Sequence, residues 1–259
     1  MIQSKPPILV HCSYHKCLTK YFARVFKGIY NKSPFKSSGY VHFNSVLADF
    51  YDKRQHYQLT SVNNHAIDLT SLGDNYRVTR FIRDPRDMII SGYFYHKKAA
   101  EPWCEVVDPS EQDWQVVNGN IPSQMKAGES YAQLLNRLDF EQGLMAEIEF
   151  RKFHFESMRY WPVDNPNIKL IRYEEMLGNE LATFQEVFEF YQLGWLATKI
   201  GEHFAKKYSA SVAKKAKGHL ATHMRDPESN QWKKHFSDEI TEYFHTKYGD
   251  IIQSHGYEL

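Results

Sequence analysis

The hydrophobic pattern near the N-terminus predicts a strand followed by a helix. Residues 8–12 form a short apolar run, which is typical of a buried strand. Apolar side chains then recur every three or four positions over residues 18–30, which is the spacing of one helical face. These side chains are Leu18, Phe22, Val25, Phe26 and Ile29. A loop at residues 13–17 therefore carries polar groups between the end of a strand and the start of a helix.

Strand and helix patterns alternate along the rest of the chain. Further strands are expected near residues 58–62, at residues 76–82 and from Asn167 onward. Further helices are expected at residues 85–98, within residues 130–159, around residues 181–191 and from Ser237, whose hydroxyl can cap the last one. This alternation indicates an α/β fold, a single domain with a mostly parallel central sheet flanked by helices. Ligands bind such sheets at the carboxyl ends of the strands.

One of the expected strands ends in the run Arg-Asp-Pro-Arg-Asp at residues 83–87. Pro85 suits the first position of a helix, and Asp84 can cap that helix. Arg83 therefore lies between a strand and a helix, and Ser91 lies about two turns into the helix. An arginine and a hydroxyl near a helix start are typical of a phosphate-binding site.

The run at residues 83–87, with Ser91 eight residues after Arg83, resembles the 3′-phosphate-binding segment of sulfotransferases. These enzymes take a sulfuryl group from 3′-phosphoadenosine 5′-phosphosulfate (PAPS). The resemblance implies that Arg83 and Ser91 bind the 3′-phosphate. Two further segments resemble the same family and occur in the same order along the chain.

The loop between the first strand and the first helix resembles the family's 5′-phosphosulfate loop, a Lys-Ser-Gly-Thr-Thr run. Lys16 falls on the family's lysine, Thr19 on its first threonine and Lys20 on the second. The resemblance implies cofactor binding by His15, Lys16, Cys17, Leu18, Thr19 and Lys20. Cys17 and Leu18 stand where the family has serine and glycine. Since a leucine does not adopt a positive φ freely, we expect this loop to present its N–H groups with ordinary helical geometry.

The segment that begins at Arg225 resembles the family's closing segment, because Trp232 follows at the same spacing. This resemblance implies that Arg225 also reaches the 3′-phosphate. Tyr173 falls on a family tyrosine that lies beside the adenine, although a role in the hydrophobic core is an alternative. Lys16, Arg83 and Tyr173 each follow an expected strand, so we expect all three at the same edge of the sheet.

The resemblance implies a P-loop NTPase-like domain over residues 1–259, with a cofactor-binding core at 6–100 and 166–236 and a helical acceptor-binding region at 101–165. It also implies an activity. The sulfuryl group of PAPS would move to a hydroxyl or amine of a small molecule or saccharide, leaving 3′,5′-bisphosphate adenosine (PAP). Lys16 would meet the charge that grows on the bridging oxygen, and no metal ion is required.

The acceptor must lose a proton, and the family resemblance points to a histidine shortly before Arg83. His65 lies in that region, and the ordinary pKa of histidine, near 6.5, suits a base at neutral pH. The chain has 13 histidines, and the family's Lys-x-His-Leu-Pro pattern is absent around His65. Asp68, Glu101 and His15 therefore remain alternative bases.

Composition narrows the class of protein. The net charge of +1 over 259 residues gives no broad positive field for holding nucleic acid. No apolar run approaches the ~18 residues of a membrane span, so no span is expected. The three cysteines Cys12, Cys17 and Cys104 fit a reducing cytoplasm. His219 and His223 have the spacing of a zinc pair, but nearby lysines would repel a dication, so no metal site is expected. The acceptor's identity and the oligomeric state stay open.

Two other function classes stay open as well. A nucleotide kinase or NTPase could use a related sheet, but the chain lacks the Gly-x4-Gly-Lys-Ser/Thr loop and has no glycine between Ser4 and Lys27. A catalytically inactive nucleotide-binding relative is the second alternative, because the family's glycines near Lys16 and Trp232 are replaced.

Overall fold

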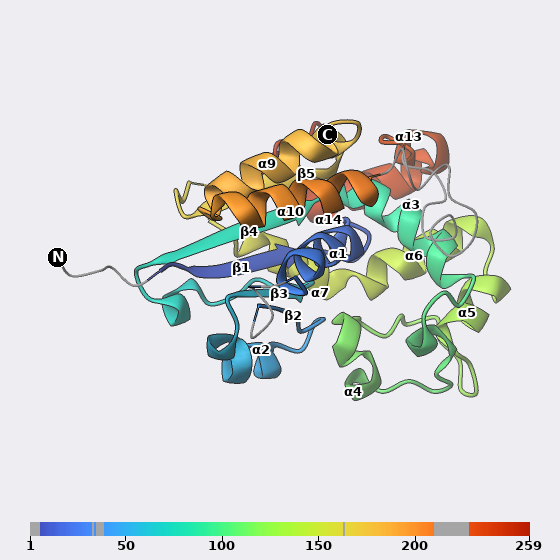
Figure 1. Cartoon of the computed structure of the whole chain (residues 1–259). Coiled ribbons are helices and arrows are strands. Elements are labelled where there is room, and N and C mark those ends of the chain that lie inside the picture. The colour runs from blue at the N-terminus through green and yellow to red at the C-terminus, as the bar shows by residue number, and fades with distance from the viewer. Residues whose placement is uncertain (1–5, 33, 35–38, 163, 210–227) are drawn as a thin grey trace. The chain divides into compact units, whose positions relative to one another are not determined.

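The strands form one parallel sheet. The computed structural model describes residues 6–32, 34, 39–162, 164–209 and 228–259. Within them the strand order is β2-β3-β1-β4-β5, with β1 in the middle (Figure 1). The strands are β1 (Ile8–Ser13), β2 (Tyr40–His42), β3 (Leu59–Asn63), β4 (Tyr76–Ile82) and β5 (Ile168–Arg172). Ser13 pairs with Asn63 of β3 and with Phe81 of β4, so these three strands end nearly level at the carboxyl edge of the sheet.

Helices precede and follow the strands along the chain. They are α1 (Thr19–Tyr30), α2 (Leu47–Lys53), α3 (Pro85–His96), α4 (Glu111–Trp114), α5 (Tyr131–Arg137), α6 (Phe140–Phe150), α7 (Lys152–Arg159), α8 (Tyr173–Met176), α9 (Glu180–Phe190), α10 (Trp195–Lys207), α13 (Trp232–His235) and α14 (Asp238–Ser254). Among the described residues, no helix is both long enough and apolar enough to cross a membrane.

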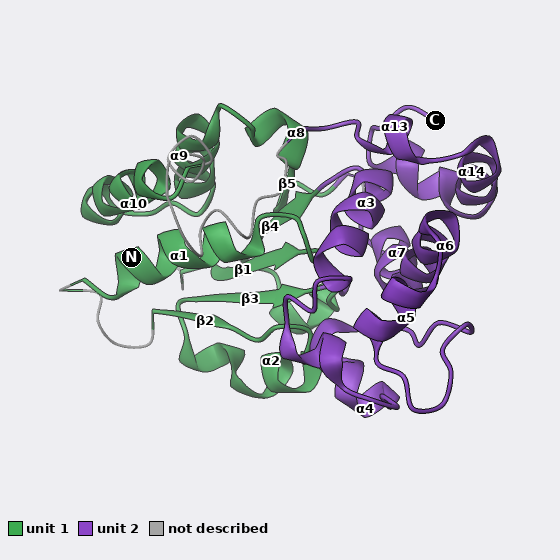
Figure 2. Cartoon of the chain, turned by 90° about the vertical axis from the view of Figure 1, so that its right-hand side faces the viewer, with its two compact units in different colours: residues 1–63, 67–82, 165–227 green, residues 64–66, 83–164, 228–259 purple. Residues whose placement is uncertain are grey.

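The chain forms two compact units (Figure 2). Unit 1 comprises residues 1–63, 67–82 and 165–227 and contains the sheet. Unit 2 comprises residues 64–66, 83–164 and 228–259 and contains α3 to α7, α13 and α14.

The predicted α/β fold with a parallel sheet flanked by helices is confirmed. The expected strands at residues 8–12, 58–62 and 76–82 are β1, β3 and β4, and the strand expected from Asn167 is β5. The expected helices are also present, with three separate helices within residues 130–159. The sequence analysis missed β2, α2, α4, α10 and α13.

The core of unit 1 lies between one face of the sheet and helices α1, α9 and α10 (Figures 1 and 2). The rings of Phe22 and Phe26 on α1 stack with their centroids 4.3 Å apart, and Phe188 of α9 meets Phe26 edge-on. Gly28 lets α10 come close to α1, because a Cβ atom at this position would lie 2.3 Å from the ring of Phe204. Aromatic packing therefore fixes α1, and with it the loop that precedes α1.

A neutral histidine lies at the centre of this core. His11 of β1 is fully buried, its ring stacks on Phe22 with the centroids 3.5 Å apart, and its Nδ1 lies 3.0 Å from Thr79 Oγ1. Burial, with a smaller effect of His42, lowers the pKa of His11 well below its ordinary value. Folding therefore requires the uncharged ring.

This histidine is expected to make stability depend on pH. Below about pH 6.5 the unfolded chain binds a proton at His11 and the folded chain does not, so stability is complete above this pH and falls as the pH decreases. Unfolding in urea between pH 7 and pH 5 should show a slope that His11→Phe reduces by about 1.4 kcal/mol per pH unit. The variant keeps the stacking, and Thr79 keeps Tyr191 as a partner. An unchanged slope would contradict this assignment.

Unit 2 has a separate core. The rings of Trp103 and Phe150 stack with their centroids 5.2 Å apart, and Trp114 packs edge-on against both rings. Beside them lies a fully buried carboxylate, Glu147, which pairs with the buried side chain of Arg151. This charged group inside an aromatic core makes unit 2 sensitive to single substitutions.

Candidate functional site

The loop from β1 to α1 is a tight turn with left-handed residues. The backbone N–H of Cys17 donates to the carbonyl of Tyr14 at 2.9 Å. Lys16 has a φ of 77° and Leu18 a φ of 60°. The expectation that this loop presents its N–H groups with ordinary helical geometry is therefore wrong. The turn has only five residues in which to lead β1 into α1, and left-handed residues reverse the chain within that length. Packing of the Leu18 side chain on the core of unit 1 offsets the roughly 1–2 kcal/mol that its conformation costs.

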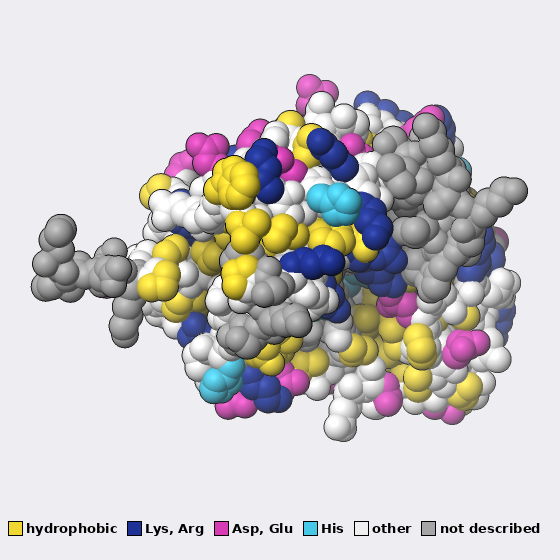
Figure 3. Space-filling view, in the orientation of Figure 1, with side chains coloured by type: hydrophobic (Ala, Val, Ile, Leu, Met, Phe, Trp, Pro, Cys, Tyr) yellow, Lys and Arg dark blue, Asp and Glu magenta, His cyan; other side chains and the backbone are white. Residues whose placement is uncertain are grey.

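The start of α1 suits an anion. Leu18 precedes the helix and has no polar group with which to cap it, and the first turn contains no acidic residue. The charged side chains of α1 are Lys20, Arg24 and Lys27, all basic. Figure 3 shows lysine and arginine side chains over the part of the surface where Figure 1 places α1. The helix dipole adds about half a positive charge at this end, and His15 and Lys16 lie partly exposed in the preceding loop.

The start of α3 confirms the predicted turn chemistry. β4 ends at Ile82, and Pro85 takes the first position of α3. The carboxylate of Asp84 caps the helix by accepting from the backbone N–H of Arg86 at 2.9 Å. Ser91 is partly buried about two turns further along α3. The strand, the cap and the helix thus lie where the motif predicts them.

Arg83 and Asp87 hold the chain segment that leads into α13. Arg83 is 5% exposed, donates to the carbonyl of Glu228 at 3.1 Å, and lies 3.5 Å from the Asp87 carboxylate. Asp87 accepts from the backbone N–H groups of Asn230 at 2.8 Å and Trp232 at 3.0 Å. Burial raises the pKa of Asp87 above its ordinary value, although Arg83 acts in the opposite direction. The sequence analysis missed this long-range role of Asp87.

His65, the candidate base, lies in unit 2 just after β3 and is partly buried. Asn118 Nδ2 lies 3.3 Å from His65 Nδ1, and the same amide donates to the carbonyl of Asn64 at 2.8 Å. This second bond orients the amide so that Nδ1 of His65 is an acceptor. Nδ1 accepts from this amide, so His65 can take a proton there only after that bond is released.

The carboxylates weighed as alternative bases have other partners. Glu101 accepts hydrogen bonds from the hydroxyl of Tyr95 at 3.0 Å and from the indole of Trp103 at 2.8 Å. Asp68 is exposed and accepts from the hydroxyl and the backbone N–H of Thr70, which lower its pKa. The lowered pKa makes Asp68 a weaker base.

Tyr173 begins α8 directly after β5 and is 7% exposed. Lys16, Arg83 and Tyr173 each follow the carboxyl end of a strand along the chain, as expected. Contact of Tyr173 with an adenine stays a prediction. Three residues weighed in the sequence analysis lie outside the described part of the chain: Arg225, His219 and His223.

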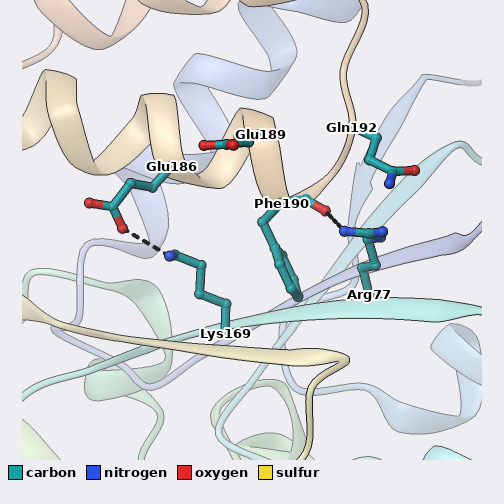
Figure 4. A pocket seen from close by; sticks show the side chains of 6 residues that line it. All are labelled: Arg77, Lys169, Glu186, Glu189, Phe190 and Gln192. Atoms are coloured by element: carbon teal, nitrogen blue, oxygen red, sulfur yellow. Dashed lines mark hydrogen bonds and ion pairs between the residues drawn. The ribbon is translucent and has the colours of Figure 1, made fainter.

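A surface pocket of about 400 Å³ lies in unit 1 at the amino ends of β4 and β5 (Figure 4). Lys169 pairs there with Glu186 at 2.9 Å, and Arg77 donates to the carbonyl of Phe190 at 2.5 Å. Since the predicted site residues follow the opposite ends of the strands, this pocket is not part of the candidate site.

The comparisons with known proteins agree with these features. A family model described as the sulfotransferase domain matches residues 5–255. Among solved structures, the chain is similar to mouse sulfotransferase SULT7A1 complexed with PAP, with 14% identity, a TM-score of 0.55, and coverage of 96% of this chain and 87% of that chain. It is also similar to retinol dehydratase, solved with androsterone and inactive cofactor PAP and with retinol and PAP, at 12% identity, a TM-score of 0.51, and coverage of 98% and 83%.

Comparison with curated proteins finds no match. The similarity to solved structures shows a shared fold, which confirms the predicted P-loop-like α/β domain. Because the family model covers nearly the whole chain, this chain belongs to the sulfotransferase domain family.

Proposed function

We propose that this chain transfers the sulfuryl group of PAPS to a hydroxyl or amine of a small molecule or saccharide. The observation that carries the proposal is the loop from β1 to α1, where Lys16 precedes a helix start with no acidic residue. The similar structures of SULT7A1 and retinol dehydratase are described with PAP, and PAP is what PAPS leaves after transfer. Membership of the sulfotransferase family supports the same cofactor here.

The described residues suit the two phosphorylated ends of this cofactor. Lys16 and Thr19, at the start of α1, offer a cation and a hydroxyl for the 5′-phosphosulfate. Arg83, just before α3, and Ser91, about two turns into it, offer the same pair of groups for the 3′-phosphate. Arg225 is the third ligand that we propose for the 3′-phosphate.

The proposed reaction exchanges one bond of sulfur for another. The acceptor oxygen or nitrogen bonds to sulfur while the bond from sulfur to the bridging oxygen breaks, and the pair of electrons stays on that oxygen. Lys16 stabilises the charge that develops there. His65 takes the acceptor's proton in this proposal, because the ordinary pKa of histidine suits a base at neutral pH, and Asp68, Glu101 and His15 are the alternatives.

The remaining parts of the proposal concern the acceptor and the compartment. We propose that residues 101–165 build the acceptor-binding region, with the cofactor-binding core at 6–100 and 166–236, and that Tyr173 packs near the adenine. The transfer as written needs no metal ion. The cytoplasm is the proposed compartment, which the free thiols of Cys12, Cys17 and Cys104 support.

Calorimetry with product tests the cofactor. The protein is expected to bind PAP with a dissociation constant in the micromolar range, and to bind AMP, which lacks the 3′-phosphate, at least ~10-fold more weakly. Arg83→Ala should weaken PAP binding about 10- to 100-fold and AMP binding far less, because the ligand group that we propose for Arg83 is the 3′-phosphate, which AMP lacks.

Arg77→Ala is the matched control, since Arg77 lies at the amino end of the same strand, β4. It should change PAP affinity less than about twofold. Circular dichroism must show that both variants are folded. Equal affinities for PAP and AMP, or ATP hydrolysis with magnesium, would contradict the proposed function.

A further inference from the structure

A continuous row of hydrogen bonds crosses β2, β3 and β1 and ends at the first residue of α1. We call this row the relay, and its members are Tyr40, Ser61, His42, Asn63, Ser13 and Thr19. The strand register creates it, because His42 pairs with Ser61, and Ser13 with Asn63, on adjacent parallel strands. Side chains at paired positions point to the same face, so these polar groups meet.

The contacts of the relay have hydrogen-bond lengths. His42 Nδ1 lies 2.7 Å from Ser61 Oγ, and Asn63 Nδ2 lies 3.4 Å from His42 Nε2. Ser13 Oγ donates to Asn63 Oδ1 at 2.9 Å and lies 2.8 Å from Thr19 Oγ1. A ligand at Thr19 therefore contacts a series of hydrogen-bonded groups in which the donor of one bond determines the donor of the next.

Burial strengthens the coupling between the hydrogen-bond directions in the relay. Ser61 is 0% exposed and Ser13 is 2% exposed, so their hydroxyls must find partners within the protein. The hydroxyl of Tyr40, 2.7 Å from Ser61 Oγ, closes the relay at the end opposite to Thr19. Each hydroxyl has one proton, which fixes the direction of every bond once one direction is set.

In the structure, Ser13 donates toward Asn63, and this direction of the relay leaves Thr19 unsuited to an anion. Ser13 gives its proton to Asn63, so its contact with Thr19 uses the Thr19 proton. The other acceptor for this proton, the carbonyl of Tyr14, is farther away at 3.5 Å. Thr19 then presents only lone pairs, which repel a phosphate oxygen.

We propose that Asn63 and His42 are positioning residues that set the direction of the relay, and that an oxyanion bound at Thr19 reverses it. This inference rests on the proposed function, because the oxyanion is the 5′-phosphate end of PAPS or PAP. In the reversed relay, Asn63 Nδ2 donates to Ser13, Ser13 donates to Thr19, and Thr19 donates to the phosphate. His42 keeps a single ring proton, which leaves Nδ1 and returns on Nε2 through water, so that Nε2 donates to Asn63 Oδ1.

His42 can exchange tautomers in this way because it is neutral at pH 7. Burial lowers its pKa to about 4, and the positive charge of Lys27 on α1 acts in the same direction. His11 of β1 also interacts with His42, and His11 is neutral as well. Both directions of the relay therefore carry the same net charge.

Nuclear magnetic resonance tests the exchange directly. Long-range ¹H–¹⁵N spectra of the full chain with ¹⁵N-labelled histidine show which ring nitrogen carries the proton. The signals that disappear in His42→Gln identify His42. At pH 7 we expect the Nδ1–H tautomer without ligand and the Nε2–H tautomer with saturating PAP.

Variants of Asn63 test the link to Thr19. Asn63→Asp keeps the shape but loses the Nδ2 donor, so the relay cannot reverse, and PAP affinity should fall about tenfold. In a Thr19→Val background, the same substitution should cost less than about twofold. Asn44→Asp is the control for charge, because the carbonyl of Asn44 accepts from the Asn63 backbone N–H at 2.6 Å. It should change PAP affinity less than about twofold.

The outcomes separate this inference from the proposed function. A His42 tautomer that stays unchanged in protein saturated with PAP would overturn the inference alone. Equal effects of Asn63→Asp with and without the Thr19 hydroxyl would do the same, because the residue would then act without the relay. Absence of any PAP binding by calorimetry would defeat the proposed function, and this inference with it.

Discussion

Replacing Glu147 by glutamine is expected to lower the free energy of unfolding by about 3–5 kcal/mol. Glu147 Oε1 accepts from Arg151 Nε at 2.7 Å, while Oε2 accepts from His96 Nδ1 at 2.8 Å and from the hydroxyl of Tyr131 at 2.7 Å. All four side chains are fully buried. Burial alone would raise the pKa of Glu147, but His96 and Arg151 hold it below its ordinary value. The substitution therefore leaves the buried charge of Arg151 without its counter-charge.

Urea unfolding at pH 7, followed by circular dichroism, measures this loss. Asp250→Asn is the matched control, because Arg159 Nε lies 2.6 Å from Asp250 Oδ2, with the two side chains 37% and 56% exposed. An exposed pair contributes at most about 1 kcal/mol, so the control should stay close to the unmodified chain. If Glu147→Gln also cost less than about 1 kcal/mol, the buried cluster would not hold unit 2 together as argued.

The missed elements show where the hydrophobic pattern carries no information about the fold. The buried residues of α10 are Ala197, Gly201 and Ala205, and the larger apolar side chains that it packs on the core, Ile200 and Phe204, are only partly buried, so the sequence shows no clear apolar face there. β2 has only three residues, two of which take part in the relay, and it is paired on one side only. By contrast, β1, β3 and β4 have buried apolar residues along their length and were predicted from the sequence.

The candidate site was predictable where local chemistry decides the structure. Asp84 and Pro85 define the start of α3 without help from distant residues, and the structure has them as predicted. The conformation of Leu18 depends instead on packing against the core of unit 1, which overrides the preference of a leucine for negative φ. The hydrogen bonds from Asn230 and Trp232 to Asp87 join positions more than 140 residues apart, and no local sequence pattern predicts them.

The relay belongs to the same class of unpredictable features. It depends on the register of three strands, since a shift of one residue would turn Asn63 away from Ser13. Polar residues at the ends of neighbouring strands were visible in the sequence, but their pairing was not. Register therefore decides which hydroxyl and which amide can act together.

Lys16→Met is expected to lower kcat for sulfuryl transfer about 100- to 1,000-fold and to change the affinity for PAP far less. Methionine keeps an unbranched chain but removes the cation that we propose for the charge on the bridging oxygen. That charge is larger in the transition state than in the bound substrate, so loss of the cation affects turnover more than binding. The rate is measured as PAP formed from PAPS in the presence of mixed phenols, amines and sugars, with product mass identifying the acceptor.

The control for this variant should separate the role of Lys16 from the general positive charge of the region. Lys32→Met removes an exposed lysine that follows α1, at the end opposite to Lys16, and kcat should change less than about twofold. An unchanged kcat in Lys16→Met would remove Lys16 from the mechanism. A large loss of PAP affinity with unchanged kcat would instead assign Lys16 to cofactor binding, because the cation would then act equally on the bound and the transition state.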